Sequence, residues 1–479
     1  MKRNYKGNLI KIKPRFYSEP VLLTPNHPVY TLKVLRENKY NGNYTYKYSI
    51  RFSKPEWKQA KELNADDCVL YPVIKEIKNI KSIKISDFVE VKKLKSGYVM
   101  PLYQTKTSNK LKDKILVDGS FLRLIGYYLA EGSAHKHQLK FYFRKDENDY
   151  INDVKYLLKK IFNLKVDLRI VANVCHMGVY SKVLCDLFKH LFGNYAFNKN
   201  LPHFIMILPK EKQVELIKGM WRGDGCIRDK DFTYVTCSRN LAYQLRDLLL
   251  RQKIICSLQK RDKEGLNRWQ NRIGGRIVIF DHDKYHIVVG GQFLKPMSKI
   301  LNKNHPEISK RSHINKQAWL RNGFAILPIR SIEKDYYKGE VLNLGVKDNN
   351  TYVAKNFIVH NCDSALYKNK NVAVIGGSDS AAKEALLLSE YAKKVYLIYR
   401  GEKIHPEPIN EERIKKNKKI EVILKTNVIE IKGNKFVNEI ILDNKYKGKN
   451  NLQVEGVFGA IGSDPLSELA KKLNVKVNN

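Results

Sequence analysis

The sequence predicts a multidomain chain in which an all-β domain is interrupted by an α/β insertion and is followed by a second α/β domain. Short β-type runs with turn signals fill residues 1–118 and return at 325–361. Residues 119–324 instead alternate helical and strand patterns, and residues 362–479 soon reach a buried-strand run and a glycine-rich turn. The length of 479 residues is sufficient for about three domains of ~150 residues each.

The charge of the chain is large and unevenly distributed. Lys and Arg number 88 against 48 Asp and Glu, which gives a net charge of +40. Residues 362–479 account for only +6 of it, from 21 basic and 15 acidic residues, so +34 falls on residues 1–361. Heat-adapted surfaces are also rich in lysine, but they balance it with glutamate, which this region does not. Clustered positive charge favours nucleic acid as the partner, because binding releases counterions.

The sequence has no sign of export or of a membrane anchor. No apolar run approaches the ~20 residues of a membrane helix. The basic N-terminus is not followed by the apolar segment of a secretory signal. The seven cysteines are scattered, with neither a CxxC pair nor metal-ligand spacing. We therefore expect a cytoplasmic protein without membrane contact, a disulfide framework or a zinc site.

Two helical segments end in an acid that is followed by glycine: LIGYYLAEG (124–132) ends at Glu131, and LIKGMWRGDG (216–225) ends at Asp224. Small residues four apart share one face of each helix, so the helices can meet backbone to backbone and bring the acids together. Paired carboxylates bind Mg²⁺, which promotes phosphodiester cleavage. One such segment alone is typical of a core helix with a glycine C-cap. Here the strand and helix that follow are also repeated, at an offset of 93 residues.

These segments resemble the two LAGLIDADG motifs of dodecapeptide (DOD-type) homing endonucleases. The resemblance implies a pseudo-twofold α/β fold over 119–324, with Glu131 and Asp224 as catalytic, metal-binding acids. It also implies Mg²⁺ as cofactor and double-stranded DNA, at an insertion site in a host gene, as substrate. In this family the sheets bind the major groove of the DNA. By the resemblance, KFYFRK and residues 227–275 would make this contact. Several lysines qualify as the basic active-site residue. The alternative is a degenerate insert that binds DNA without cutting it.

The β segments around this insertion resemble the Hint splicing domain of inteins. LTPNHPVY matches one N-terminal block, with Thr24 and His27 as its TxxH pair, and GEVLNLGVKDNNTYVAKNFIVHNC resembles the two C-terminal blocks. The resemblance implies an all-β Hint domain built from residues 1–118 and 325–361. It implies that His27, with Thr24 nearby, polarises the upstream scissile bond.

The triplet His360-Asn361-Cys362 suits the chemistry of splicing. An Asn side-chain amide can attack its own backbone carbonyl carbon and release the next residue. By the resemblance Asn361 cyclises and His360 assists the proton transfer, since an imidazole has a pKa near neutrality. Cys362 is then the first residue of the C-terminal extein and accepts the acyl chain through its thiol.

Two departures from the intein pattern limit this expectation. Asn343 and Asn350 stand where the C-terminal block usually carries Asp and His, and Asn350 cannot act as an acid or base. The Cys or Ser that precedes the first block is missing, because the chain opens at Met1. We therefore expect C-terminal cleavage after Asn361 rather than complete splicing in cis. A separate N-terminal fragment would be the partner for complete splicing.

The stretch from residue 362 onward resembles the NADPH-binding domain of thioredoxin reductase. Strand VAVIG leads into a turn that opens a helix, as at a pyrophosphate site. The turn consists of Gly376, Gly377, Ser378, Asp379, Ser380 and Ala381. Arg400 rather than an acid ends the second strand, which favours the 2′-phosphate of NADPH. By the resemblance Cys362 is the second redox cysteine and Asp363 the proton-handling acid.

Residues 362–479 would then be a truncated host domain, with FAD bound only by the missing part of the host. The remaining alternative is a redox flavoenzyme fragment that carries an inert insertion.

Overall fold

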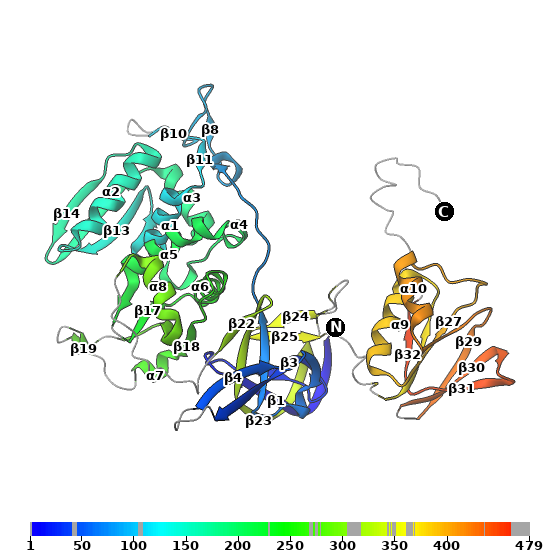
Figure 1. Cartoon of the computed structure of the whole chain (residues 1–479). Helices are drawn as coiled ribbons and strands as arrows, with labels where there is room; N and C mark the ends of the chain where they lie inside the picture. Colours follow the sequence, from blue (N-terminus) through cyan, green and yellow to red (C-terminus); the bar gives the residue numbers. More distant parts are fainter. Residues whose placement is uncertain are drawn as a thin grey trace.

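The computed structural model contains a β domain (blue and yellow in Figure 1), a mixed insertion (cyan to green) and a C-terminal α/β domain (orange to red). It describes residues 2–40, 46–103, 109–228, 230–267, 272–273, 276–277, 279–303, 318–342, 344, 346, 351–360, 367, 369–434 and 436–460. Among the helices of these ranges, none is both long and apolar enough to cross a membrane.

The β domain joins strands from both sides of the insertion in one sheet. Its order is β2-β1-β23-β6-β3-β25-β24, with β4, β5 and β22 attached at β3 and β23. The bounds are β1 (Lys2–Pro14), β2 (Val21–Leu23), β3 (Pro28–Tyr40), β4 (Tyr46–Phe52), β5 (Glu56–Gln59), β6 (Asp67–Pro72), β22 (Trp319–Arg321), β23 (Phe324–Leu342), β24 (Thr351–Ala354) and β25 (Phe357–His360). The antiparallel ladder of β1 and β23 runs from Lys2 opposite Leu342 to Pro14 opposite Ile329. The chain therefore leaves this sheet at the start of the insertion and returns to the same sheet after it.

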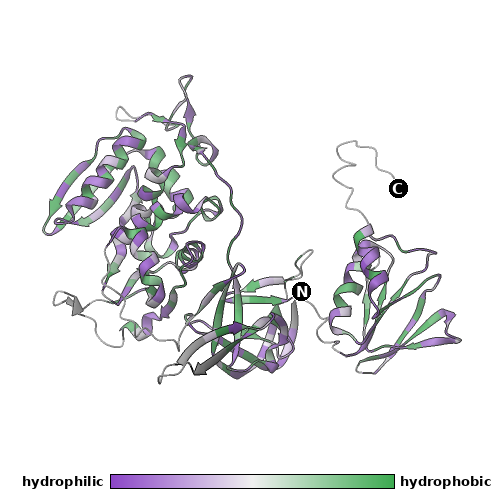
Figure 2. Ribbon diagram, in the orientation of Figure 1, coloured by the Kyte–Doolittle hydropathy of each residue, from purple (hydrophilic) through white to green (hydrophobic). Residues whose placement is uncertain are grey.

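Hydrophobic and hydrophilic residues alternate along these strands, as expected for sheets with one buried face (Figure 2). A short module connects the β domain with the insertion. It contains β7 (Ser82–Lys84) paired with β11 (Lys114–Leu116), and the small sheet β8 (Lys92–Lys93), β9 (Tyr98–Met100) and β10 (Leu111–Lys112). Short 3-10 helices occur at Ala60–Glu62 and Ile85–Asp87.

The insertion contains one arrangement twice. The first copy has α1 (Gly119–Glu131), β12 (Gly132–His135), β13 (Gln138–Arg144), α2 (Asn148–Phe162), β14 (Asp167–Val171), β15 (Val174–Tyr180) and α3 (Lys182–Phe192). The second has α5 (Lys210–Asp224), β16 (Gly225–Ile227), β17 (Asp231–Thr236), α6 (Arg239–Arg251), β18 (Ser257–Arg261), β21 (Lys284–Gly290) and α8 (Leu294–Leu301). The sheets are β12-β13-β15-β14 and β16-β17-β21-β18. Smaller elements are α4 (His203–Met206), α7 (Lys263–Asn267), β19 (Arg272–Ile273), β20 (Arg276–Ile277) and 3-10 turns at Ala196–Asn198 and Gly291–Phe293.

A buried arginine joins the insertion to the β domain. Arg246 of α6 is 2% exposed, forms an ion pair with Asp247 (3.0 Å) and donates to the hydroxyl of Tyr71 on β6. It also donates to the carbonyl of Lys355 (3.2 Å), between β24 and β25. Its guanidinium lies over the ring of Tyr71, 4.1 Å from the centroid. Apolar side chains of both units form one continuous core around this joint.

The C-terminal domain has a parallel sheet of order β28-β27-β26-β32 and a separate antiparallel sheet β29-β30-β31. The elements are β26 (Asn371–Ile375), α9 (Asp379–Tyr391), β27 (Lys394–Ile398), α10 (Pro408–Lys416), β28 (Ile420–Ile423), β29 (Val428–Gly433), β30 (Val437–Tyr446), β31 (Lys449–Gln453) and β32 (Val457–Gly459). Strand, turn and helix follow in the order predicted for a nucleotide-binding unit.

Arg246→Ala should destabilise the protein by about 1–3 kcal/mol, because it removes the ion pair of the half-buried Asp247 carboxylate and the donor to the buried Tyr71 hydroxyl. Denaturant unfolding followed by circular dichroism would measure this loss. Arg239→Ala is the matched control, because Arg239 is half exposed in its ion pair with Glu19 and should contribute at most about 1 kcal/mol. Equal losses in the two variants would refute the structural role of Arg246.

Candidate active site

Helices α1 and α5 touch through their backbones. A Cβ atom added to Gly126 would lie 2.3 Å from the carbonyl oxygen of Leu216, and one on Gly219 would lie 2.3 Å from the carbonyl oxygen of Arg123. Real side chains do not tolerate such distances to backbone atoms. The structure thus brings the two small-residue faces together, as the sequence predicts.

The contact places both predicted acids at one end of the helix pair. Glu131 is the last residue of α1 and Asp224 the last of α5. A Cβ atom on Gly223 would lie 2.9 Å from Cγ and 3.7 Å from Oε1 of Glu131, so the Glu131 side chain lies against the end of α5. Burial raises the pKa of Glu131 to about 7. Asp224 is exposed at the surface, but desolvation by the surrounding protein and the charge of Glu131 raise its pKa to about 8.

Lys199 lies next to this pair and is the functional candidate that sequence reasoning left unassigned. It is 3% exposed, and its ammonium group donates to the carbonyl oxygens of Tyr128 (2.7 Å) and Gly132 (2.8 Å) at the end of α1. Burial lowers the pKa of Lys199 to about 7, against the opposite effect of the Asp224 charge. Its signal in the sequence is its place between the two repeats, since it is the one lysine among residues 193–209.

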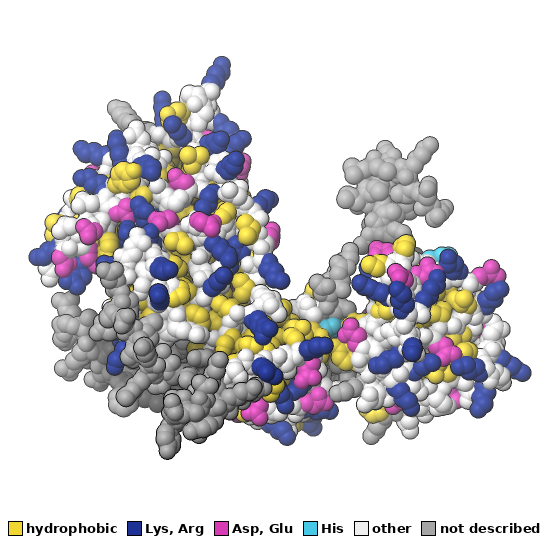
Figure 3. All heavy atoms as spheres, viewed as in Figure 1, with side chains coloured by type: hydrophobic (Ala, Val, Ile, Leu, Met, Phe, Trp, Pro, Cys, Tyr) yellow, Lys and Arg dark blue, Asp and Glu magenta, His cyan; other side chains and the backbone are white. Residues whose placement is uncertain are grey.

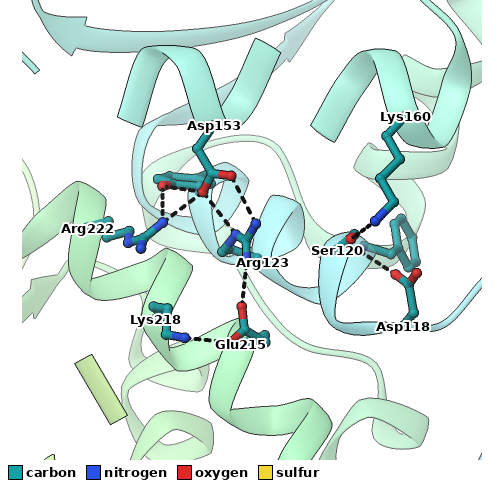
Figure 4. Close-up of polar contacts among 10 residues, drawn as sticks. Asp118, Ser120, Arg123, Asp153, Lys160, Glu215, Lys218 and Arg222 are labelled. Atoms are coloured by element: carbon teal, nitrogen blue, oxygen red, sulfur yellow. Dashed lines mark hydrogen bonds and ion pairs between the residues drawn. The ribbon is translucent and has the colours of Figure 1, made fainter. Parts of the chain in front are cut away.

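A polar network joins α1, α2 and α5 (Figure 4). Asp153 of α2 accepts hydrogen bonds from Arg123 of α1 (2.9 Å) and Arg222 of α5 (2.7 Å). Arg123 also donates to Glu215 of α5 (2.6 Å), which accepts a second bond from Lys218 (2.5 Å). Since Arg222 is two residues before Asp224, this network positions the end of α5.

The sheet of the first repeat presents a polar, basic face. On β13, Leu139, Phe141 and Phe143 are buried, while Lys140 and Tyr142 are partly exposed and Arg144 is exposed. Lys and Arg side chains are spread over the face of the insertion drawn in Figure 3.

The second sheet carries positive charge on β18 and β21. Burial lowers the pKa of His286 on β21 to about 4, and the nearby charges of Arg261, Lys284 and Arg228 lower it further in the same direction. Three cations close to one imidazole create the positive potential that a phosphate backbone requires.

In the β domain, Thr24, His27 and His360 lie at the same end of the sheet. Thr24 and His27 belong to the turn before β3, where the Thr24 carbonyl accepts the His27 amide (3.0 Å). His360 ends β25, which pairs with β3 through Val359 opposite Val29.

The environment of His360 corrects one expectation. Its ring packs edge-on against Trp57 at 5.1 Å between centroids, and burial lowers the pKa of His360 to about 4. The imidazole is therefore neutral at pH 7 rather than half protonated. Asn361, Cys362 and Asp363, with Asn343 and Asn350, lie outside the described residues.

The glycine-rich turn of the C-terminal domain is tightly constrained. Gly376 has φ +149°, and a Cβ atom there would lie 2.4 Å from the carbonyl oxygen of Ala460. A Cβ atom on Gly377 would lie 2.5 Å from the ring of Tyr399. Only glycine permits these approaches, as the predicted phosphate-binding turn requires.

The remaining fingerprint residues begin α9. Ser378 and Ser380 are exposed, while Ala381 is buried. The Asp379 carboxylate accepts hydrogen bonds from the Glu407 amide (2.9 Å) and Asn410 (2.8 Å) and pairs with Lys383, and these contacts lower the pKa of Asp379 to about 2. Arg400 is exposed, two residues after the end of β27.

Two family models match parts of the chain. The model of the LAGLIDADG-like domain matches residues 211–288, and that of pyridine nucleotide-disulphide oxidoreductases matches residues 339–479. Neither match reaches half of the chain.

Curated relatives cover different parts of it. The uncharacterized protein MJ0043 of Methanocaldococcus jannaschii is 32% identical over 391 residues, which are 77% of this chain and 46% of that protein. The ATP-dependent DNA helicase Hel308 of Thermococcus kodakarensis is 27% identical over 386 residues, 75% of this chain and 32% of the helicase. Thioredoxin reductase of Spironucleus barkhanus is 43% identical over 111 residues, 23% of this chain and 36% of the reductase. The chain spans less than half the length of each of these relatives.

Solved structures also resemble parts of the chain. Variants of the homing endonuclease I-DmoI are 14% identical with a TM-score of 0.30, covering 39% of this chain and 98% of theirs. Thioredoxin reductase of Streptococcus pyogenes is 31% identical with a TM-score of 0.22, covering 24% of this chain and 39% of its own.

The family matches confirm two of the three resemblances, whereas the Hint interpretation of the β domain stays a prediction. The protein thus contains a LAGLIDADG-like domain and a C-terminal region of the pyridine nucleotide-disulphide oxidoreductases that is similar to thioredoxin reductases.

Proposed function

We propose that the insertion is a Mg²⁺-dependent endonuclease that cuts double-stranded DNA at an insertion site in a host gene. The observation that carries the proposal is the pair Glu131 and Asp224, held together by the glycine contact of α1 and α5. The match to the LAGLIDADG-like domain over residues 211–288 supports the same reading.

The two carboxylates suit a hard divalent cation. Glu131 is partly exposed and Asp224 is exposed, so a cation can reach both, and it would offset the desolvation and the like charge that raise their pKa values. The part of the chain that the structure describes has no cluster of three or more His, Cys, Asp or Glu side chains around one position. Phosphate oxygens of DNA and water would supply the remaining ligands, an arrangement that Mg²⁺ favours. The bound ion would stabilise the charge that develops on the scissile phosphate.

The side chains around the acids have distinct roles in this proposal. Lys199, with a pKa of about 7, can exchange a proton near neutral pH or neutralise charge on a phosphate oxygen. The polar face of β13 and the cations around His286 bind the DNA backbone on either side of the acids. The network of Arg123, Asp153 and Arg222 holds the helix ends in place.

We also propose that the β domain is an intein splicing domain that cleaves the chain after Asn361. The Asn361 side-chain nitrogen attacks its own carbonyl carbon, the peptide bond to Cys362 breaks, and the amine of Cys362 takes up the proton. The neutral His360 is suited to accept the proton that the amide loses. Thr24 and His27 lie at the same end of the sheet and serve the upstream junction.

For the C-terminal region we propose NADPH as ligand. The turn at Gly376 and Gly377 allows a pyrophosphate to approach the N-terminus of α9, where backbone amides have no partner within the helix. The exposed Arg400 after β27 is available for a 2′-phosphate. Reductase activity would require FAD and a second redox cysteine that pairs with Cys362. We assign this activity to the host protein as a whole.

Glu131→Gln should retain DNA binding but cut at least ~100-fold more slowly, because a neutral amide stabilises the metal and the transition state poorly. The assay uses duplex DNA with the uninterrupted host sequence and Mg²⁺. Asp186→Asn is the control, since Asp186 is an acid of the same insertion that pairs with Lys182 on α3 (2.6 Å) and whose charge is not among the causes of the pKa shifts of Glu131 and Asp224. Wild-type protein that binds this DNA but never cuts it would favour the degenerate, DNA-binding alternative.

Asp224→Asn should raise the melting temperature at pH 8.5 in EDTA. The folded pKa of Asp224, about 8, lies above its unfolded value, so ionisation costs stability as pH rises from about 4 through 8. Because Asp224 is exposed, solvent screens much of this cost, so the gain should be at most about 1 kcal/mol, which corresponds to roughly 2–4 °C in a domain of this size. Asp153→Asn, which breaks ion pairs with Arg123 and Arg222, should lower it instead. A melting temperature of wild type that does not fall between pH 6 and 8.5 would contradict this account.

Cleavage after Asn361 should appear as two fragments in intact-mass analysis and should vanish in Asn361→Ala. Because the pKa of His360 is about 4, its neutral form predominates above pH 5, so the rate should be level from pH 5.5 to 8 and fall as the pH drops through 4. Half-maximal cleavage near pH 6.5 would contradict the burial of His360. A single unchanged mass at every pH would show that the splicing chemistry is inactive.

A further inference from the structure

The two repeats of the insertion differ in the aromatic pair behind each acid. An offset of 93 residues relates Glu131 to Asp224, and the same offset relates Tyr128 and Phe141 to Trp221 and Tyr234. Both pairs are in ring contact, edge-on in the first repeat (centroids 6.4 Å apart, interplanar angle 77°) and tilted in the second (5.4 Å, 42°). The first pair carries one polar hydrogen and the second carries two.

The strand register places Tyr234 beside its acid. Gly225, the residue after Asp224, lies directly opposite Tyr234 in the β16–β17 ladder, as Gly132 lies opposite Phe141 in β12–β13. The charges of Asp224 and of Glu131 both act on the Tyr234 phenol and, after burial, raise its pKa well above the ordinary value. The hydroxyl is therefore protonated and close to both carboxylates.

The buried donors of the two repeats differ in their partners. In the first repeat the Tyr128 hydroxyl donates to the carbonyl oxygen of Gly193 (2.6 Å). In the second, neither the Tyr234 hydroxyl nor the Trp221 indole NH has a hydrogen-bond partner among the residues that the structure describes, although the two residues are 0% and 2% exposed. A buried donor without an acceptor costs about 1–3 kcal/mol, which natural proteins retain mainly where the donor serves a site.

We propose that Tyr234 is a positioning residue that makes the two halves of the nuclease site unequal. Its hydroxyl donates to the Asp224 carboxylate, directly or through one ordered water molecule, when the site is assembled on DNA. Phe141 offers no such donor to Glu131. A carboxylate that accepts this bond is held in one orientation and shares less negative charge with a cation. The two DNA strands are then cut at different rates. The inference rests on the proposed endonuclease function.

A strand-resolved nicking assay tests this inference with Tyr234→Phe, which removes one oxygen. Each strand of the duplex target carries its own label, and the ratio of the two first-cut rates is measured. We expect wild type to nick one strand first and the variant to shift the ratio by about two- to tenfold, the range that one hydrogen bond of 0.5–1.5 kcal/mol allows. DNA affinity should stay within twofold, which separates positioning from folding or binding defects.

Mn²⁺ binding without DNA supplies a readout that does not need cleavage. Electron paramagnetic resonance titration should show a Mn²⁺ dissociation constant altered about two- to tenfold in Tyr234→Phe. Phe141→Tyr, which adds a donor to the first repeat, should also shift the strand ratio, in the direction of equal cutting. Tyr128→Phe is the matched control, since its hydroxyl is already bound to Gly193, and should leave the ratio unchanged.

The outcomes separate the two proposals. Wild type that cuts no DNA would refute the endonuclease function, while the Mn²⁺ titration would still test the hydrogen bond. An unchanged Mn²⁺ constant together with an unchanged strand ratio in Tyr234→Phe would overturn the role of Tyr234. If Tyr234→Phe does not fold, Phe141→Tyr decides alone, and an unchanged strand ratio in that variant would overturn the proposal.

Discussion

The backbone contact between α1 and α5 is the constraint on which the rest of the insertion depends. A side chain at Gly126 or Gly219 would collide with main-chain atoms of the opposite helix, which cannot move aside as a flexible side chain can. The contact leaves one arrangement for the helix ends, and both end in an acid. Each acid is followed by a strand, so the contact also sets where the two sheets begin.

The same contact creates an electrostatic cost at the site. Desolvation raises the pKa of Glu131 and of Asp224, and their like charges oppose ionisation further. The side chains that stabilise the helices lie apart from this pair, in the network of Asp153 with Arg123 and Arg222. The ion pairs that stabilise the helices thus involve neighbouring side chains, whereas the acids themselves have raised pKa values, as is common at functional sites.

The β domain can hold the insertion because its longest strand pairing joins segments that are far apart in the sequence. Strands β1 and β23 pair along most of their length although the whole insertion separates them. The joint at Arg246 reaches Tyr71 on β6 and Lys355 in the turn before β25, the strand that ends at His360. Helix α6 of the insertion and the turn before the strand that ends at His360 therefore share one buried cation.

The sequence by itself determined the features that are local. The alternation of short strands, the repeated acid before glycine at Glu131 and Asp224, and the glycine turn at Gly376 are all visible in a window of a few residues, because backbone periodicity and glycine tolerance act over that range. Only the tertiary structure decided which lysine lies beside the acids, that His360 is neutral at pH 7 and that Tyr234 has no partner. These properties depend on burial by residues distant in sequence, and desolvation has no signature in a local pattern.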